Sequence, residues 1–390
     1  MYSFINMKKG YSGMTVDVFR NRVARLLKEI QEKALDGLLL FSDEYRPGYT
    51  VYISDYKPIN VIEESPEGVF ISAKGEVVLF LGAINVQAAK KVSWIEDIRS
   101  VETLPEFFNV QRDRVNGRKL KIGLVGEALL PVKYYRRLQA ALADNDFIYM
   151  DDILTSMRQI KNDQEILLME KAAEIGDASI RSALERMKRG KVSEIELCAT
   201  AEFTIRERGG DIGSATVLSS GMNTEAPTWR PTHKEIDIGE AVLIDMAPSY
   251  NGYCSDVAVT VFNGKVDGEK KKPLALSKDI LLETIAFMKP GEPASSIYDS
   301  FLKQTKKYGY EDYFTPYAQG LRAVGHSVGL DVVERPNLDS DATFLMEPGM
   351  TLGVKFDLHG FDFGGLRMEA VVLVERNGCR SLNKIIEEIN

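Results

Sequence analysis

The chain has 390 residues, of which 44% are hydrophobic and 27% are charged, as in ordinary globular proteins with a full core. The formal net charge is -8 and the isoelectric point is about 5.3. No nucleic acid and no anionic membrane is therefore expected as a partner, because both need a basic face. No secretory signal and no membrane-spanning run is found, and the three cysteines lack CxxC spacing. A cytoplasmic protein with reduced thiols is expected.

The N-terminal part of the chain alternates predicted helices and strands. Residues 1–14 are expected to form a flexible lead-in. Apolar residues at helical spacing then predict a helix over 16–35, with Thr15 as its N-cap. Further strands are predicted at 36–41, 51–54, 67–72, 75–81 and 119–126, and helices at about 84–91 and 131–145. This alternation indicates an α/β domain over residues 15–152. No glycine-rich phosphate-binding motif occurs in it.

A second domain is expected over residues 153–390. It opens with a long helix from about Asp163, which Gly190 should end. Ser193 and Glu196 form a capping-box pattern at the start of the next helix. Strands at 214–219 and 241–246 and helices at about 276–288 and 294–308 follow, and the segment from residue 326 to the end should alternate short strands and turns.

The segment AVLIDMAPSYNGYCSDVAVTVF (241–262) predicts a β-hairpin that turns at Asn251-Gly252. A turn centred there sets Asp245 opposite Ala258, and Asp256 lies two residues from Ala258. Both carboxylates then project from one face, about 7–8 Å apart. Carboxylates on an apolar strand are costly unless a positive charge answers them. The alternative is a surface hairpin with two solvated aspartates.

Two later motifs supply groups that could answer these carboxylates. GHSVG places His326 between glycines, and LRMEAVVLV places Glu369 on a strand beside Arg367. We expect Asp245, Asp256, His326 and Glu369 to converge on one acidic pocket. Carboxylates with one imidazole suit Mn, Fe, Co or Zn.

The order of these motifs resembles the pita-bread metallopeptidase family. A strand aspartate followed by GYCSD, then GHSVG, then GM and RME is similar to its motifs. The family includes Xaa-Pro aminopeptidases, prolidases, methionine aminopeptidases and the metal-free creatinases. The resemblance covers the whole chain and implies an α+β fold. A C-terminal pita-bread (creatinase/aminopeptidase) domain would follow an α/β creatinase-type N-terminal domain, and a homodimer is expected.

The resemblance also implies a ligand set and one departure from it. In the peptidase branch two aspartates, one histidine and two glutamates hold two metals. By resemblance four of these are Asp245, Asp256, His326 and Glu369, whereas the fifth position is Lys355. A protonated ammonium cannot ligate a metal. Choosing Glu347 as the fifth ligand would shorten the interval to the histidine by eight residues. We therefore keep Lys355 and expect it to be protonated, because nearby carboxylates raise the pKa of a lysine.

Substrate groups of the family also differ in this chain. Its two substrate histidines fall on Thr228 and Val333, and an arginine falls on Val259. By resemblance, the expected acid–base groups are His326 and Glu369, with Lys355 as electrostatic stabiliser. The expected substrate contacts are Thr228, Trp229, Arg230 and Arg367. A packed surface loop remains the alternative for Trp229, and pairing with a carboxylate the alternative for Arg367.

Three functions stay open at this point. The first is a hydrolase of the Xaa-Pro peptidase/creatinase type that acts on a small peptide, amide or amidine, with one divalent metal (Mn, Co, Zn or Fe) or without metal. The second is an ordinary metal-dependent Xaa-Pro dipeptidase or aminopeptidase. The third is a catalytically inert module that binds a peptide or a carboxylate.

Overall fold

The computed structural model describes residues 10–59, 66–142, 147–314 and 323–389. The chain divides into two compact units, Met1–Arg158 and Gln159–Asn390. The domain boundary expected between residues 152 and 153 falls near the start of the helix α6 (Asp151–Gln159) and stays a prediction. Among the helices of the described residues, none is both long and apolar enough to cross a bilayer.

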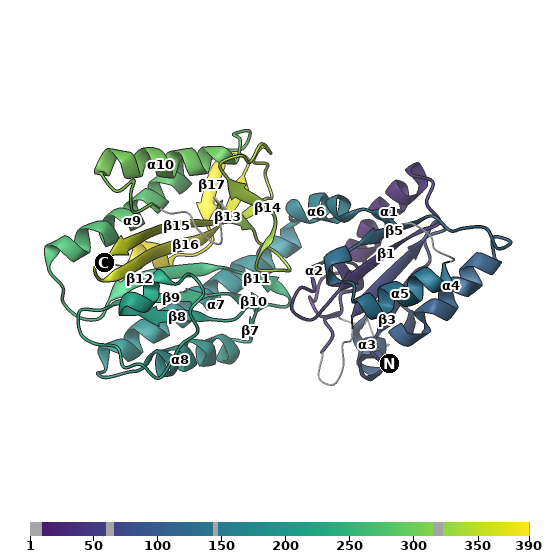
Figure 1. Cartoon of the computed structure of the whole chain (residues 1–390), viewed down its shortest axis with the longest axis horizontal. Coiled ribbons are helices and arrows are strands. Elements are labelled where there is room, and N and C mark those ends of the chain that lie inside the picture. The colour runs from purple at the N-terminus through teal and green to yellow at the C-terminus, as the bar shows by residue number, and fades with distance from the viewer. Residues whose placement is uncertain (1–9, 60–65, 143–146, 315–322, 390) are drawn as a thin grey trace, which may run out of the picture. The chain divides into compact units, whose positions relative to one another are not determined.

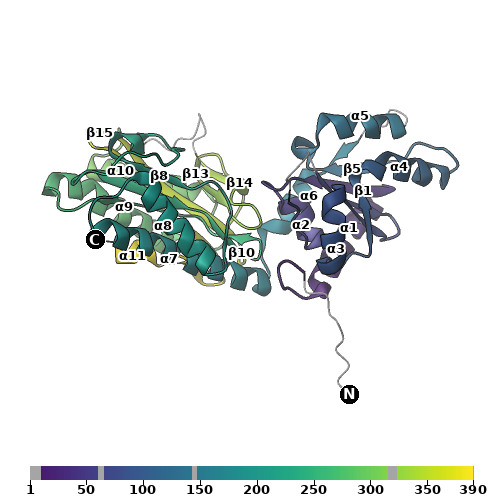
Figure 2. The same cartoon turned by 90° about the horizontal axis from the view of Figure 1, so that it is seen from below.

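The N-terminal unit is a six-stranded sheet with helices on both faces (Figures 1 and 2). Its strand order is β4-β3-β2-β1-β5-β6, and β1 is buried along its whole length, as its continuous apolar sequence requires. The strands are β1 (Gly37–Ser42), β2 (Glu67–Ser72), β3 (Val77–Leu81), β4 (Asp97–Ser100), β5 (Ile122–Val125) and β6 (Ile148–Tyr149). The helices, besides short 3₁₀ turns, are α1 (Val16–Glu32), α2 (Gly48–Ser54), α3 (Val86–Val92), α4 (Leu104–Asp113) and α5 (Val132–Ala141). Neither β4 nor α4 was expected from the sequence.

The strand predicted at residues 51–54 is wrong, because these residues belong to the helix α2. Their β-branched and aromatic side chains favour a strand only weakly, and tertiary contacts override that preference. Thr50 and Ser54 lie one helical turn apart, and both hydroxyls donate hydrogen bonds to the buried carboxyl group of Glu67, at 2.6 and 2.8 Å. A helix is needed to bring both hydroxyls to the same group.

Part of the expected N-terminal lead-in is described, namely residues 10–14. The backbone N–H of Ser12 donates to the Asp55 carboxylate at 2.9 Å, and Met14 is buried. Residues 1–9 lie outside the described residues, as does the end of the helix predicted at 131–145.

The C-terminal unit is built on a curved antiparallel sheet in the order β14-β13-β15-β16-β12-β9-β8, with β17 paired to β16 (Figure 1). Its strands are β8 (Val217–Ser220), β9 (Ala241–Met246), β12 (Val257–Phe262), β13 (Ala323–Ser327), β14 (Glu334–Asp339), β15 (Thr351–Phe361), β16 (Gly364–Glu375) and β17 (Gly378–Ser381). A small separate sheet contains β7 (Asp211–Ile212), β10 (Pro248–Tyr250) and β11 (Tyr253–Cys254). Long strands β15 and β16 replace the short strands expected near the C-terminus, because their alternating sequence buries one full face.

Helices cover one face of this sheet (Figure 2). They are α7 (Asp163–Lys188), α8 (Glu194–Glu207), α9 (Gly268–Phe287), α10 (Ser295–Tyr308) and α11 (Ile385–Glu388). The capping box predicted at Ser193 and Glu196 is confirmed. Helix α9 begins earlier than predicted, because Asp267 caps it and the turn of lysines before Pro273 is helical.

Alternation along the strands separates a core face from a polar face. Even-numbered residues of β15 and β16, from Val354 to Leu358 and from Leu366 to Val374, join the hydrophobic core with the helices. Odd-numbered residues therefore point to the opposite face. Charged side chains at these odd positions make the candidate site.

Candidate active site

The hairpin expected from Asn251-Gly252 is confirmed. Both turn residues have positive φ, 48° and 91°, as a two-residue turn of this kind requires. Asp245 pairs with Ala258, as predicted from the turn position. Asp256 lies just before β12 instead of within it, because β11 and β12 are separate strands with residues 255 and 256 between them.

Strand register aligns the site residues in one row across the sheet. Lys355 of β15 lies opposite Glu369 of β16, Glu369 lies opposite Ala258 of β12, and Ala258 lies opposite Asp245 of β9. Residues directly opposite in antiparallel strands share a face. Ala258 is the small residue of the row, so the charged side chains on both sides of it have room above its methyl group.

His326 joins this face from β13, where it lies opposite Gly353. A Cβ atom at Gly353 would lie 3.4 Å from the imidazole and 3.6 Å from the Glu369 carboxylate. Gly325 has φ 149°, and a Cβ there would lie 1.9 Å from the Gly353 carbonyl oxygen. These glycines let the histidine strand and β15 approach closely.

Asp256, His326 and Glu369 form a compact buried cluster. His326 Nε2 lies 3.5 Å from Asp256 Oδ2 and 4.0 Å from Glu369 Oε1. One potential ligand atom from each residue lies within 4.8 Å of the other two. Within the described residues, Glu369 Oε1 has no hydrogen-bond partner, although it is buried. An orphaned carboxylate oxygen between an imidazole and a second carboxylate fits one divalent cation.

His326 is arranged to present a lone pair to this cluster. Its Nδ1 lies 3.0 Å from the carbonyl oxygen of Ser327, which can only accept, so Nδ1 carries the proton. Burial lowers the pKa of His326 to about 4. At neutral pH the ring is uncharged, and Nε2 is an acceptor or a ligand.

Asp245 lies on the same face, beside the cluster, and pairs with Arg367. Its Oδ2 accepts a hydrogen bond from Arg367 Nη1 at 2.7 Å, and Arg367 Nε donates to Asp357 Oδ1 at 2.9 Å. Arg367 is 6% and Asp357 2% exposed, so this is a buried clamp. Three of the four residues expected to converge thus lie within ligand distance of one another, and the fourth, Asp245, lies near them and pairs with Arg367. The alternative that Arg367 pairs with a carboxylate accords with these contacts.

Lys355 is the other positive group of the face. No hydrogen bond or ion pair of its side chain is found in the described part of the chain. Burial lowers the pKa of Lys355, but the carboxylates of Glu369, Asp357 and Asp245 outweigh burial and raise it. Lys355 is therefore an ammonium at neutral pH. The face thus contains two buried cations, Lys355 among the carboxylates and Arg367 paired with Asp245, and the place of Lys355 in the family's ligand set stays a prediction.

The carboxyl groups of the cluster hold their protons unusually tightly. Burial raises the pKa of Glu369 to about 7, with Lys355 opposing the shift. Burial and the neighbouring Glu369 and Asp245 raise the pKa of Asp256 well above its usual range. A carboxyl group with a pKa near 7, as in Glu369, is suited to proton transfer.

The expected substrate loop is tied down by a buried acid that the sequence did not reveal. Glu194, fully buried, accepts hydrogen bonds from the Trp229 indole N–H at 3.3 Å and from the Thr232 hydroxyl at 2.7 Å. Trp229 thus packs against the scaffold. Thr228 and Arg230 are exposed, and the carbonyl of Pro227 next to Thr228 accepts a hydrogen bond from Arg367 at 3.3 Å. Substrate contact by Thr228, Trp229 and Arg230 stays a prediction.

The polar face contains two further residues that were not predicted from the sequence. Asp357 and His359 follow Lys355 at alternate positions of β15. The signal was present, since V-K-F-D-L-H alternates apolar and polar residues with the period of a strand.

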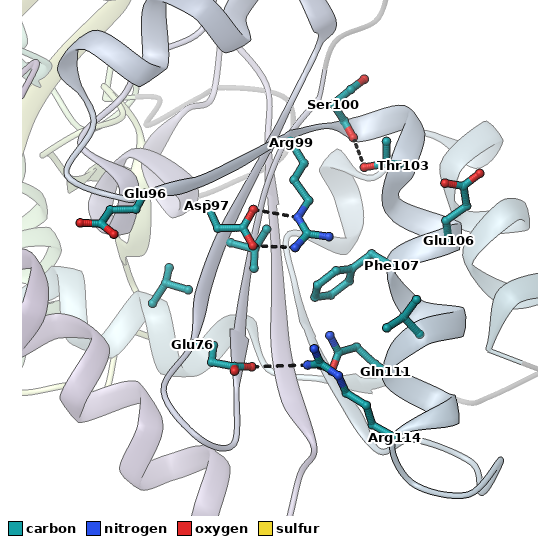
Figure 3. A pocket seen from close by; sticks show the side chains of 13 residues that line it. Glu76, Glu96, Asp97, Arg99, Ser100, Thr103, Glu106, Phe107, Gln111 and Arg114 are labelled. Atoms are coloured by element: carbon teal, nitrogen blue, oxygen red, sulfur yellow. Dashed lines mark hydrogen bonds and ion pairs between the residues drawn. The ribbon is translucent and has the colours of Figure 1, made fainter.

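The N-terminal unit has a separate hollow of about 740 Å³ between β3, β4 and α4 (Figure 3). Both arginines of its lining are paired: Arg99 Nη2 lies 2.7 Å from Asp97 Oδ2, and Arg114 Nη1 lies 3.9 Å from Glu76 Oε2. The Arg99 guanidinium also lies 5.1 Å from the centre of the Phe107 ring. Ion pairs of this kind are typical of a surface groove that is open to solvent.

Comparison with known proteins agrees with this architecture. The model of metallopeptidase family M24 matches residues 167–376, and that of the creatinase/prolidase N-terminal domain matches residues 22–160. An Xaa-Pro dipeptidase of Pyrococcus horikoshii is 26% identical over 376 residues, which is 96% of this chain and 100% of the relative. The chain belongs to metallopeptidase family M24, and its fold is the α+β pita-bread fold preceded by a creatinase-type domain, as expected.

Solved structures show the same fold. The prolidase of Pyrococcus horikoshii superposes with a TM-score of 0.81 over 93% of this chain and 98% of its own, at 24% identity. The X-Pro aminopeptidase of Thermotoga maritima gives a TM-score of 0.79 at 25% identity, covering 93% and 97%. The N-terminal domain of a FACT complex subunit from chickpea gives 0.74 at 12% identity, covering 96% and 99%. A shared fold alone does not assign an activity.

Proposed function

We propose that this protein is a hydrolase of the Xaa-Pro dipeptidase type that cleaves a C–N bond in a small peptide or amide, with one cation site and Lys355 in place of a second metal. The relatives named Xaa-Pro dipeptidase or prolidase align over nearly the whole chain. One observation carries the proposal: the ammonium of Lys355 stands opposite Glu369, beside the cluster of Asp256, His326 and Glu369.

Charge balance supports a single cation. When ionised, as metal ligands are, Asp256 and Glu369 bring two negative charges to the face, Asp245 and Asp357 bring two more, and Arg367 and Lys355 balance two of the four. The remaining excess is what one divalent ion neutralises. Asp256, His326 and Glu369 would hold Mn, Co, Zn or Fe. When bound, such an ion polarises a carbonyl group and increases the acidity of water.

The chain's own residues have distinct roles in this proposal. Glu369 takes the proton of the attacking water and returns it to the leaving nitrogen, because its carboxyl group lies at the centre of the row. Lys355 stabilises the negative charge that develops on the carbonyl oxygen. His326 presents Nε2 to the cluster, and Arg367 holds Asp245 and Asp357 apart from it.

The number of metal ions bound by the wild type and by two variants of Lys355 tests whether this lysine takes the place of a second metal ion. The wild type should bind at most one equivalent of Mn²⁺ or Zn²⁺ in equilibrium dialysis. Lys355→Glu should gain a second equivalent, because it restores a carboxylate at the fifth position. Lys355→Met is the control, since it removes the charge without adding a ligand, and it should gain none. Two equivalents in the wild type would contradict the proposal.

Hydrolysis of Xaa-Pro dipeptides, amino-acid amides and amidines tests the activity itself. Glu369→Gln should lower kcat about 10²- to 10⁴-fold, as expected for loss of a general base. Without turnover of any of these substrates by the metal-loaded protein, the alternative of an inert peptide-binding module is favoured. The FACT subunit with this fold is the observation that keeps this alternative open.

Assembly and location are further parts of the proposal. A homodimer is proposed from the family resemblance, and light scattering of the purified protein tests it. The three cysteines are free thiols, which suits the reducing cytoplasm.

A further inference from the structure

His359 extends the polar face beyond the clamp of Arg367. It follows Asp357 at the next odd position of β15, and its side chain lies above Gly365 of β16. A Cβ at Gly365 would lie 2.7 Å from His359 Nδ1, and a Cβ at Gly364 would lie 2.2 Å from the Thr224 hydroxyl. The two glycines therefore make room for an imidazole and for the segment that carries Glu225.

Glu225 faces this imidazole from the end of that segment. Its Oε2 lies 3.5 Å from His359 Nδ1, and its Oε1 accepts a hydrogen bond from the backbone N–H of Gly360 at 2.9 Å. Nδ1 is buried and forms no hydrogen bond of normal geometry with the described residues. For Nε2, no hydrogen bond or ion pair is found in the same part of the chain.

The position of Glu225 decides which partner Nε2 takes. A carboxylate beside Nδ1 favours the tautomer with its proton there, and Nε2 of a neutral ring is then an acceptor. Three carboxylates, those of Glu225, Asp357 and Asp245, surround this end of the face, and the two cations Arg367 and Lys355 balance them only in part. An acceptor in a negative field fits a positively charged N–H donor.

We propose that His359 and Glu225 form the subsite for the α-amino group of the substrate, with His359 Nε2 accepting a hydrogen bond from the ammonium. The inference rests on the proposed peptide hydrolase. It adds that the N-terminal end of the bound peptide points along β15 towards His359. His359 lies four residues from Lys355, about 13 Å along the strand, a span that a short peptide and two side chains fill. By resemblance, the family's two substrate histidines fall on Thr228 and Val333 in this chain. His359 provides an imidazole group to the polar face, which these two residues cannot.

Two peptides and one variant test this subsite. Binding of Ala-Pro and of N-acetyl-Ala-Pro is measured by calorimetry in the Glu369→Gln background, where turnover should be slow. His359→Asn keeps an N–H near the place of Nδ1 and removes Nε2. It should weaken Ala-Pro binding about ten-fold or more, as expected for a hydrogen bond to a charged group, and leave the acetylated peptide unchanged. Equal effects on both peptides, or none, would overturn the subsite.

Control variants separate a contact from a general loss of structure. His233→Asn changes an exposed histidine and should alter neither affinity. Glu225→Gln retains an acceptor for Gly360 but loses the charge, and should reduce the preference for the free amine without lowering the Tm. Binding with the predicted preference but without hydrolysis by the protein with intact Glu369 refutes the hydrolase and keeps the subsite. Failure of both peptides to bind overturns the subsite itself.

Discussion

Glu67 in the N-terminal unit and Asp357 in the C-terminal unit are both buried carboxyl groups, but their surroundings differ in kind. Hydroxyl groups of Thr50 and Ser54 meet Glu67, and burial raises its pKa to about 8. Burial alone raises the pKa of Asp357 as well, but Arg367 and Lys355 outweigh burial and lower it. Glu67 is therefore neutral at pH 7, whereas Asp357 is ionised.

Glu67 is therefore a neutral acid with a structural role, whereas the ionised Asp357 contributes to the electrostatic field of the site. A neutral carboxyl group needs only hydrogen bonds to be tolerated in a core. An ionised one needs fixed cations, and fixed cations create a field that a substrate or a metal can feel. Three experiments test whether the two acids differ in this way, and a fourth compares them with an exposed ion pair.

The largest effect is expected for Arg367→Met. The substitution leaves Asp245 and Asp357 buried without their cation, so the free energy of unfolding should fall by about 3–5 kcal/mol. Urea unfolding at pH 7 measures it. Adding Asp357→Leu to this variant should recover part of the loss, and a single variant as stable as the wild type would refute the clamp.

The pH dependence of stability should identify Glu67 as the neutral acid. Its folded pKa of about 8 exceeds the ordinary value of 4.5, so the folded state keeps the proton that the unfolded state releases between these pH values. Its contribution is complete below pH 4.5 and is lost as the pH rises towards 8. Glu67→Gln should flatten this part of the stability curve by a few kcal/mol. An unchanged slope between pH 5 and 8 in urea titrations would contradict a neutral Glu67.

Thr50→Val tests the hydroxyl shell with a smaller change. Valine has the shape of threonine but leaves Glu67 Oε2 without a donor, so a loss of about 1–3 kcal/mol is expected. Thermal unfolding reports the change. Thr200→Val provides the matched control, because the Thr200 hydroxyl is exposed and donates only within its own helix.

The smallest effect is expected for Arg137→Ala, which breaks an exposed pair with Glu102. Solvent screens this pair, so the stability should change by about 1 kcal/mol or less. Comparison with the loss of stability in Arg367→Met shows how much more a buried arginine–carboxylate pair contributes than an exposed one. A large effect at Arg137 would remove the distinction between the two regions.

Local signals in the sequence predicted much of the architecture. Asn251-Gly252 predicted the register that sets Asp245 opposite Ala258, because a two-residue turn leaves no freedom in the pairing. Capping residues predicted the start of α8. The strand predicted at 51–54 failed, since a long-range contact with Glu67 decides its conformation.

The sequence by itself determined the family, the two-domain order and the residue types of the site, including the lysine at position 355. These follow from motifs whose spacing is local. Only the tertiary structure decided how the charges are divided: Arg367 takes Asp245, and Asp256, His326 and Glu369 cluster. It also brought Glu225 to His359, which are 134 positions apart in the chain. Pairings between distant strands depend on sheet register and on the room that glycines leave, and no short segment of the sequence contains either.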